Sequence, residues 1–331
     1  MQLWLGLNPV VVLGFIYLLG LVAYAVLGGA DFGGGILDLF LTGPRAAESR
    51  LAISEAMEPV WEANHVWLIL LIVLTFVCFP PAFAAMMTAF FGIFHLVLLG
   101  IILRGAAFVF RNNAEGHSSL AWSRVFSIGS LMTPFLLGDA LGALSSGAIR
   151  AQGTVYNVSY ARAFFSPLSL LMGAMGVAIA AYVGAVFMTV ESKGLAKDDF
   201  RQYGLIAGTV VALLSLMLLP ALHGSFLWAK ITAPAGVALM LTGIVLAIAS
   251  GWALSGRKYH LARVLTVAEV AVIISQWAVA QWPYIIYPDF PAPTTGAIPT
   301  ILFTLNAFPF GLLILIPSLI FLFVTFKRNQ A

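Results

Sequence analysis

Charged residues are the scarcest part of this sequence. Only 9% of its 331 residues are Asp, Glu, Lys or Arg, whereas 61% are hydrophobic. A soluble domain carries roughly a quarter charged residues. So few charges could not cover a surface that faces water, so we expect lipid to surround the chain. The Lys and Arg residues stand singly in short connections, without the dense basic patch of a nucleic-acid-binding protein.

Cysteine and histidine are also rare. The single cysteine, Cys78, excludes an internal disulfide and lies in an apolar run without the neighbours of a metal site, so no metal site is predicted. Of the five histidines, only His65 and His95 are expected at membrane depth. The sequence lacks the repeated histidine pairs of a two-haem stack, although His65 and His95 could together ligate one haem.

Long apolar runs fill most of the chain. A spanning helix needs roughly 20 mostly apolar residues, and its backbone polar groups must be satisfied within the segment. The sequence therefore predicts an all-α integral membrane protein, with residues 1–331 forming a single polytopic domain of two four-helix bundles and one peripheral helix. About nine spans are predicted, at 9–30, 56–79, 82–105, 122–144, 165–190, 202–222, 232–254, 261–282 and 298–325.

The distribution of Lys and Arg predicts the orientation of these spans. With nine spans, 13 of the 16 basic residues fall on one side of the membrane, and only Arg150, Arg162 and Lys230 fall on the other. Cytoplasmic connections carry an excess of Lys and Arg. The sequence therefore predicts a periplasmic N-terminus and a cytoplasmic C-terminus.

The densest group of ionisable residues opens the second predicted span. Glu58, Glu62 and His65 share one helix face because they are four and three residues apart. Asp31, just past the end of the first predicted span, lies on the same side of the membrane. Ionisable residues at membrane depth are costly and mark functional sites, so these four are candidates for a proton entry path. Alternatively, the acids are structural and interact with the helix dipole.

Two more ionisable residues, His95 and Glu269, are predicted to be buried. Each lies about nine residues from the cytoplasmic end of its span, or about 14 Å, which would place both in one polar layer. Asp139 is expected to be solvated or paired with Arg150 or Arg162. The remaining basic residues at membrane depth, Arg104 and Arg111, are expected to anchor the third span at the cytoplasmic interface.

Three motifs stand out: Gly-Gly-Ala-Asp31-Phe-Gly-Gly-Gly-Ile-Leu-Asp38, Pro59-Val-Trp-Glu62-Ala-Asn-His-Val-Trp67-Leu, and Leu103-Arg104-Gly-Ala-Ala-Phe108 with Phe110-Arg111. Together they resemble subunit II of the cytochrome bd-type quinol oxidases, including the cyanide-insensitive branch. The length, the number of spans and the order of motifs agree along the whole chain. The first two motifs are specific, and the second half of the chain is matched mainly by hydropathy.

The resemblance implies a respiratory complex of the bacterial cytoplasmic membrane that oxidises quinol and reduces oxygen to water. Its subunit I would carry the b- and d-type haems and the quinol site, so this chain is expected to bind no haem by itself. A structural quinone or lipid, and a small single-span accessory subunit, are further expected partners.

The resemblance also implies roles for particular residues. Glu62 and Asp31 correspond to acids of a proton path, and Trp67 to a tryptophan near a proposed oxygen route. His65 stands where other members have Gln. Some relatives carry a second acid just before the glycine run, where this chain has Leu27.

Two alternatives stay open at the level of sequence. A secondary transporter could use Glu62, His95 and Glu269 as coupling groups, although the inverted repeats that would favour it are not clear in the sequence. A self-contained b-type cytochrome could use His65 and His95.

Overall fold

The computed structural model describes residues 3–42, 46–57, 64–113, 117–152 and 155–328. Eight helices in these ranges are long and apolar enough to cross a membrane, and α4 (Val66–Cys78) is a shorter apolar helix. The fold class is therefore as predicted. The eight helices are α1 (Pro9–Asp38), α6 (Phe91–Asn113), α7 (His117–Ser145), α9 (Pro167–Glu191), α10 (Ala196–Leu222), α12 (Pro234–Ser255), α13 (Tyr259–Gln281) and α15 (Ile298–Arg328).

Short elements connect the long helices. The short helices are α2 (Ala46–Met57), α5 (Pro80–Ala89), α8 (Tyr160–Phe164), α11 (Phe226–Ile231) and α14 (Ala292–Thr295). Two antiparallel hairpins, absent from the all-α prediction, are β1 (Ile149–Gln152) with β2 (Val155–Val158) and β3 (Tyr284–Ile286) with β4 (Phe290–Pro291). In the first hairpin Ile149 pairs with Val158.

Proline marks the starts of several spans. Pro9, Pro167 and Pro234 each open a long helix, where the missing backbone N–H costs nothing. The side chain of Asn8 caps α1 by accepting a hydrogen bond from the backbone N–H of Val10 at 3.0 Å. Ser166 caps α9 in the same way through Ser169.

Two predicted boundaries are wrong, and a third span lies partly outside the described residues. α1 continues through the glycine run to Asp38, so Asp31 lies inside the helix and not past its end. The predicted span 56–79 is represented by the end of α2 and by α4. The predicted span 82–105 consists of α5 and the first part of α6, because the helix is interrupted at Phe90.

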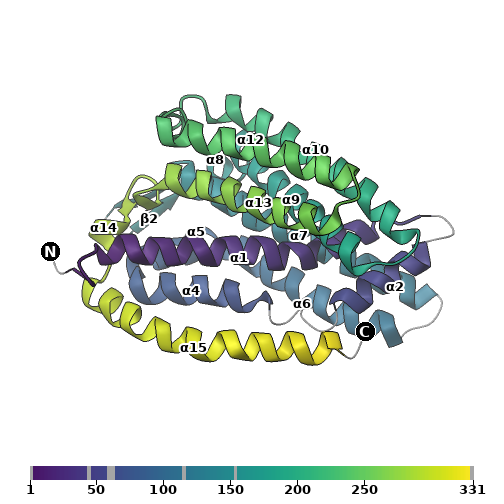
Figure 1. The fold of residues 1–331 in the computed structure, drawn as a ribbon. Helices are drawn as coiled ribbons and strands as arrows, with labels where there is room; N and C mark the ends of the chain where they lie inside the picture. The colour runs from purple at the N-terminus through teal and green to yellow at the C-terminus, as the bar shows by residue number, and fades with distance from the viewer. Residues whose placement is uncertain (1–2, 43–45, 58–63, 114–116, 153–154, 329–331) are drawn as a thin grey trace.

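The long helices form a layered bundle (Figure 1). α1 runs through its middle, α15 lies along the outside beside α4, and α10 and α12 lie on the opposite side. One hydrophobic core lies among α1, α4, α5, α7 and the hairpins. A second core lies among α9, α10, α12 and α13, with one face of α1 packed against it.

Glycine brings α1 and α9 into backbone contact at the boundary between these cores. A Cβ atom on Gly33 would lie 2.1 Å from the carbonyl oxygen of Ala180 and 2.8 Å from the Cα of Gly184. Only residues without side chains allow membrane helices to approach so closely. The glycine run that follows Asp31 therefore serves helix packing as well as marking the motif.

Candidate functional site

The first functional cluster is centred on Asp31 in the middle of the protein. Asp31 is only 3% exposed. The side-chain amide of Asn64 donates to Asp31 Oδ2 at 2.7 Å and to the carbonyl oxygen of Leu27 at 3.3 Å. Asn64 therefore ties the chain just before α4 to the carboxylate on α1.

His65 lies beside this contact. Its ring packs against Tyr24 and Phe32 of α1, with ring centroids 6.2 and 5.9 Å away. Among the described residues neither of its buried ring nitrogens has a hydrogen-bond partner.

Arg104 brings a positive charge to the same cluster. Its guanidinium lies over Phe32 at 4.9 Å and over Phe126 at 5.5 Å, and it interacts electrostatically with Asp31 and Tyr24. The expectation that Arg104 anchors α6 at the membrane surface is wrong, because its side chain is directed into the protein and the residue is 1% exposed. The carboxylate of Asp31 and the aromatic faces compensate its charge there.

Buried polar atoms without partners gather around Asp31. They are the hydroxyls of Tyr24 and Ser130, both ring nitrogens of His65, and Nε and Nη2 of Arg104, none of which has a partner within the described ranges. Ser130 reaches α1 because Gly35 has no side chain; a Cβ there would lie 2.0 Å from Ser130 Oγ. Most buried polar atoms in proteins are hydrogen-bonded, so such a group indicates a special environment. We call these five residues, Tyr24, Asp31, His65, Arg104 and Ser130, the Asp31 chamber.

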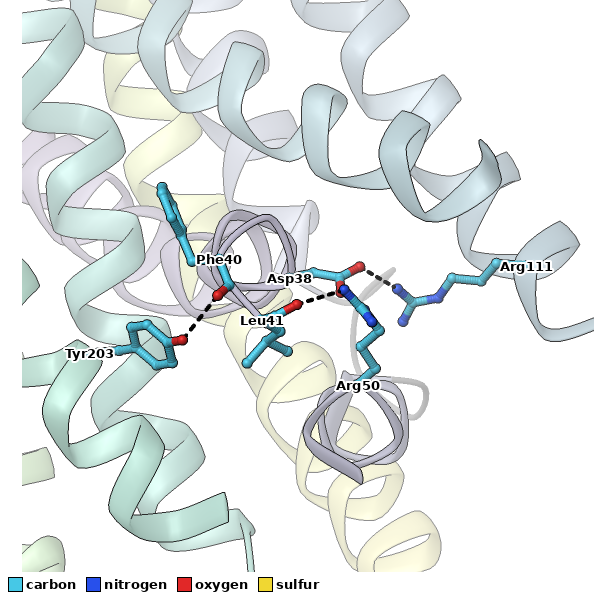
Figure 2. Close-up of polar contacts among 6 residues, drawn as sticks. All are labelled: Asp38, Phe40, Leu41, Arg50, Arg111 and Tyr203. Atoms are coloured by element: carbon cyan, nitrogen blue, oxygen red, sulfur yellow. Dashed lines mark hydrogen bonds and ion pairs between the residues drawn. The ribbon is translucent and has the colours of Figure 1, made fainter. Parts of the chain in front are cut away.

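A second acid, Asp38, lies at the end of α1 (Figure 2). Its Oδ1 accepts from Nε of Arg50 at 2.5 Å, and its Oδ2 pairs with Nη1 of Arg111 at 3.4 Å. Arg50 also donates to the carbonyl oxygen of Leu41 at 2.9 Å, and Tyr203 donates to that of Phe40 at 3.1 Å. These contacts join α1 to α2, α6 and α10.

The two acids repeat along α1 with the same spacing as two arginines along α6. Asp31 and Asp38 are seven residues apart, as are Arg104 and Arg111, which is about two turns or 10.5 Å along a helix. Phe126 of α7 lies against both guanidinium groups, 5.5 Å from Arg104 and 4.2 Å from Arg111. Arg111 is 8% exposed, so it too is buried and not the surface anchor that we expected.

Several predicted site residues lie elsewhere or cannot be placed. Glu58 and Glu62 are outside the described residues. Trp67 lies half-buried on α4, and its role in an oxygen route stays a prediction. His95 is not buried as expected. It lies four residues after the start of α6, and its exposed ring is tilted against that of Phe91, with ring centroids 4.3 Å apart. Its Nδ1 contacts the carbonyl oxygen of Phe91.

Glu269 is buried as expected, at 3% exposure, but it forms a separate cluster. Its carboxylate contacts Tyr182 of α9 and Ser250 of α12. The predicted polar layer of His95 and Glu269 is therefore wrong, because His95 lies near the opposite end of α6 from Arg111. Asp139 is 2% exposed, and Arg150 pairs with Asp289 instead.

Sequence reasoning missed three members of the chamber and its surroundings. Tyr24 lies seven residues before Asp31, on the same face of α1, but an uncharged tyrosine in an apolar run gives little signal. Ser130 is one of many small residues in α7. Asn64 lies in the second of the three motifs, and its position two residues after Glu62 is a signal that its amide could take part in the site.

The two histidines considered as haem ligands lie apart. His65 packs against α1, whereas the ring of His95 is exposed on the flank of α6, so the two do not face a shared iron site. Across the described ranges, no group of three or more His, Cys, Asp or Glu side chains could hold a metal ion.

An apolar cavity of about 460 Å³ lies along the first half of α1. Its walls come from α1, α4, α5, α6, α7 and the end of α13. Residues around it include Val10, Tyr17, Leu71, Phe79, Gln281 and Trp282.

Comparison with known proteins identifies the family. The family model of cytochrome bd terminal oxidase subunit II matches residues 9–326. A cytochrome bd ubiquinol oxidase subunit 2 of Bacillus subtilis is 29% identical over 253 residues, which cover 75% of this chain and 71% of that protein. The cytochrome bd-I ubiquinol oxidase subunit 2 of Escherichia coli is 31% identical over 178 residues, 53% of this chain and 46% of that protein.

The fold is also known. The solved structure of bd oxidase from Geobacillus thermodenitrificans matches with a TM-score of 0.78 at 20% identity, covering 97% of this chain and 99% of that one. At this identity the likeness speaks for the fold, whereas the family follows from the match over residues 9–326. The chain belongs to the cytochrome bd terminal oxidase subunit II family.

Proposed function

We propose that this chain delivers protons from the cytoplasm, through the Asp31 chamber, toward an oxygen-reducing site in subunit I. Family membership makes the chain a subunit of a terminal quinol oxidase and a multi-pass protein of the bacterial cytoplasmic membrane. The observation that carries the proposal is the group of buried polar atoms around Asp31 that lack partners among the described residues.

Water is the simplest partner for these atoms. Internal water typically makes about three hydrogen bonds to polar groups that the protein leaves unsatisfied. The unpartnered atoms come from α1, α6, α7 and the residue before α4, so water among them would link several helices. A carboxylate in contact with such water can accept a proton and pass it on.

Asp38, Arg50 and Arg111, which we call the Asp38 cluster, are placed where an entrance to the chamber could lie. Arg50 has a side chain 35% exposed, whereas the Asp38 side chain is 2% exposed, so the pair reaches from solvent into the protein. Glu58 and Glu62 precede Asn64 in sequence by six and two residues. We propose that they bring protons to the same point, since the amide of Asn64 holds Asp31. The direction of transfer rests on the predicted orientation.

The exposed flank of α6 supports pairing with subunit I. His95 lies there among the exposed apolar residues Phe91, Leu98 and Ile102. An ionisable side chain facing lipid is costly, so we propose that subunit I covers this flank. In this arrangement subunit I carries the haems and oxidises quinol, and a small single-span subunit binds elsewhere. No residue of this chain is assigned to haem.

The apolar cavity supports a second, structural role. Its volume and lining suit the apolar part of a quinone or a lipid chain. Gln281 and Trp282 supply polar groups at its edge. We propose that a quinone or lipid occupies it as a structural component.

The main test replaces the acids in the intact oxidase complex. We expect Asp31→Asn and Glu62→Gln to lower quinol-dependent oxygen uptake by about tenfold or more, equivalent to about 1.4 kcal/mol in the barrier, while the haem spectrum stays unchanged. Asp139→Asn, a buried acid outside the chamber, is the matched control and should retain wild-type turnover.

Wild-type turnover in Asp31→Asn would contradict the proposal. Loss of the haem spectrum in that variant would instead assign Asp31 to assembly. The transporter and the self-contained cytochrome are not favoured, because the family match covers most of the chain and the two histidines do not face one iron site.

A further inference from the structure

Another buried acid, Glu269, forms a compact polar cluster in the other half of the bundle. Tyr182, Ser250, Thr266 and Glu269 are between 0 and 3% exposed. They come from three helices: α9 contributes Tyr182, α12 contributes Ser250, and α13 contributes the other two. Apolar residues surround them, including Val183, Val186 and Val270.

Three oxygen atoms of this cluster form a closed triangle. Tyr182 Oη lies 2.7 Å from Ser250 Oγ and 3.1 Å from Glu269 Oε2, and Ser250 Oγ lies 2.9 Å from the same Oε2. Each side of the triangle is a hydrogen-bond distance, and a hydrogen bond along all three sides takes three protons. Thr266 contributes no proton to it, because its hydroxyl donates to Tyr182 Oη from outside at 3.0 Å.

Counting protons favours the neutral acid for the closed triangle. The hydroxyls of Tyr182 and Ser250 supply one proton each, which is enough for two sides of the triangle. A carboxylic acid at Glu269 supplies the third, so that each group donates once around the ring. With an ionised Glu269 the two hydroxyls would both turn to Oε2 and leave the 2.7 Å contact between Tyr182 and Ser250 without a proton.

The cluster can also release this proton without leaving a donor unpaired. Ser250 Oγ has a second acceptor, the carbonyl oxygen of Ala247 at 3.0 Å, and both hydroxyls can donate to the carboxylate. The neutral acid closes the triangle, and the ionised acid still receives a hydrogen bond from each hydroxyl, so the group can bind and release a proton.

The charged groups on neighbouring elements lie away from Glu269. α12 carries none, and the charged residues of α10, Lys197, Asp198, Asp199 and Arg201, lie in its first two turns, whereas a Cβ on Gly208 of the same helix would meet the ring of Tyr182. α11 carries Lys230, near the end of the bundle opposite to Arg263. On α1, Asp31 points to the face opposite from Val22 and Val26, which pack toward Tyr182. Among the described residues Glu269 has no ion-pair partner in the structure.

A route to solvent starts at one end of α13. Arg263 precedes Thr266 by three residues, or about 4.5 Å of helix, and pairs with Glu191 of α9 at 3.1 Å, with both side chains partly exposed. Next to this pair, a pocket of about 280 Å³ is lined by Lys197, Tyr259, His260 and neighbouring residues. This is the end of the helices that the sequence predicts to be cytoplasmic.

We propose that Glu269, Tyr182 and Ser250 form a second proton-binding site, which exchanges its proton with the cytoplasm through Thr266 and the Arg263–Glu191 pair. The site is separate from the Asp31 chamber, because the backbones of α1 and α9 touch between them at Gly33 and Gly184. Its ligand is the proton itself.

Infrared difference spectroscopy of the intact oxidase complex tests the proposal without relying on turnover. We expect wild type minus Glu269→Gln to show the C=O stretching band of a protonated carboxylic acid, which shifts on transfer to D₂O. Tyr182→Phe should move the band, because it removes a hydroxyl from the ring and keeps the aromatic packing. Thr242→Val, which removes an exposed hydroxyl of α12 that contacts only Ala238, should not.

Three results would overturn parts of the proposal. Loss of carboxylate bands in Glu269→Gln, especially bands that respond to Na⁺, would assign an ionised group or a cation site. An acid band that does not shift in D₂O would assign a sealed structural acid. An exchange rate in Thr266→Val equal to that of wild type would overturn the route through Thr266, whereas we expect exchange to slow by about tenfold, equivalent to about 1.4 kcal/mol in the barrier. If Glu269→Gln does not assemble, the shift in Tyr182→Phe still decides the assignment.

Discussion

The Asp31 chamber and the triangle of Tyr182, Ser250 and Glu269, which we call the Glu269 ring, are two buried carboxyl sites with opposite surroundings. Around Asp31 the protein provides a cation, Arg104, and leaves several polar atoms without partners among the described residues. Around Glu269 it provides hydroxyls, and no cation pairs with the acid in the described part of the chain. A charge beside unsatisfied polar groups suits a hydrated passage, whereas a closed ring of hydroxyls suits a group that binds its proton as a neutral acid.

The largest expected effect comes from removing the cation of the chamber. Arg104→Met leaves the buried carboxylate of Asp31 without its neighbouring charge, and leaving a buried charge uncompensated costs about 3–5 kcal/mol. We expect a strongly lowered thermal midpoint of the complex. Adding Asp31→Asn should restore part of it, because the acid then needs no cation. A midpoint unchanged in Arg104→Met alone would show that Arg104 does not compensate Asp31.

The next largest loss of stability is expected at the backbone contact between α1 and α9, which separates the two sites. Gly33→Ala places a methyl group against the carbonyl oxygen of Ala180 and the Cα of Gly184, both backbone atoms that cannot rotate away. We expect a loss of about 1–3 kcal/mol, typical of overpacking. Gly29→Ala is the control, because its Cβ would lie 3.7 Å from Ala180 Cα. Equal thermal midpoints for the two variants would mean that α1 and α9 are not in close contact at Gly33.

Each site contains one buried tyrosine hydroxyl, and removing each hydroxyl in turn distinguishes the two sites. Tyr182→Phe removes a hydroxyl that has hydrogen-bond contacts with Ser250, Glu269 and Thr266 and should cost about 1 kcal/mol. Tyr24→Phe removes a hydroxyl that has no partner among the described residues, so its thermal midpoint should change less. Its oxygen uptake should fall instead, as water in the chamber loses a contact. The reverse ranking of thermal midpoints would break the distinction between ring and chamber.

The smallest effect is expected at the exposed end of the Asp38 cluster. The Arg50 side chain is 35% exposed, so Arg50→Gln should cost less than about 1 kcal/mol, and less still in high salt. Arg111→Gln should cost more, because that side chain is 7% exposed and stacks on Phe126. Equal melting shifts for the two variants would indicate that Asp38 is as open to solvent as Arg50.

Hydropathy predicted the spans from Leu120 onward well, because each is a long apolar run between polar or proline-containing connections. It failed between Pro80 and Arg111, where the apolar composition continues through the interruption at Phe90. That error moved His95 to the wrong depth. The glycine run was likewise interpreted as a helix end, although packing against α9 keeps it helical.

The sequence predicted only some of the residues in the two sites. The motifs indicated Asp31 and His65. Glu269 was indicated by the free-energy cost of burying an ionisable residue in a membrane helix, where such residues are rare. The partners of these residues come from other helices, and the rotation of one helix against another is set by packing that a single sequence does not reveal. For this reason Ser130, Ser250 and Tyr182 could not be assigned in advance, and Arg104 was placed at the surface.

The apolar cavity along the first half of α1 has one more consequence. A cavity lined by apolar side chains stays dry. Any chain of water molecules that starts at Asp31 would therefore end near Tyr24. A continuous water file across this chain would short-circuit the membrane potential, which is worth about 2.3 kcal/mol per charge at 100 mV. The apolar first half of α1 would therefore insulate the membrane electrically, even if water surrounds Asp31 in the other half.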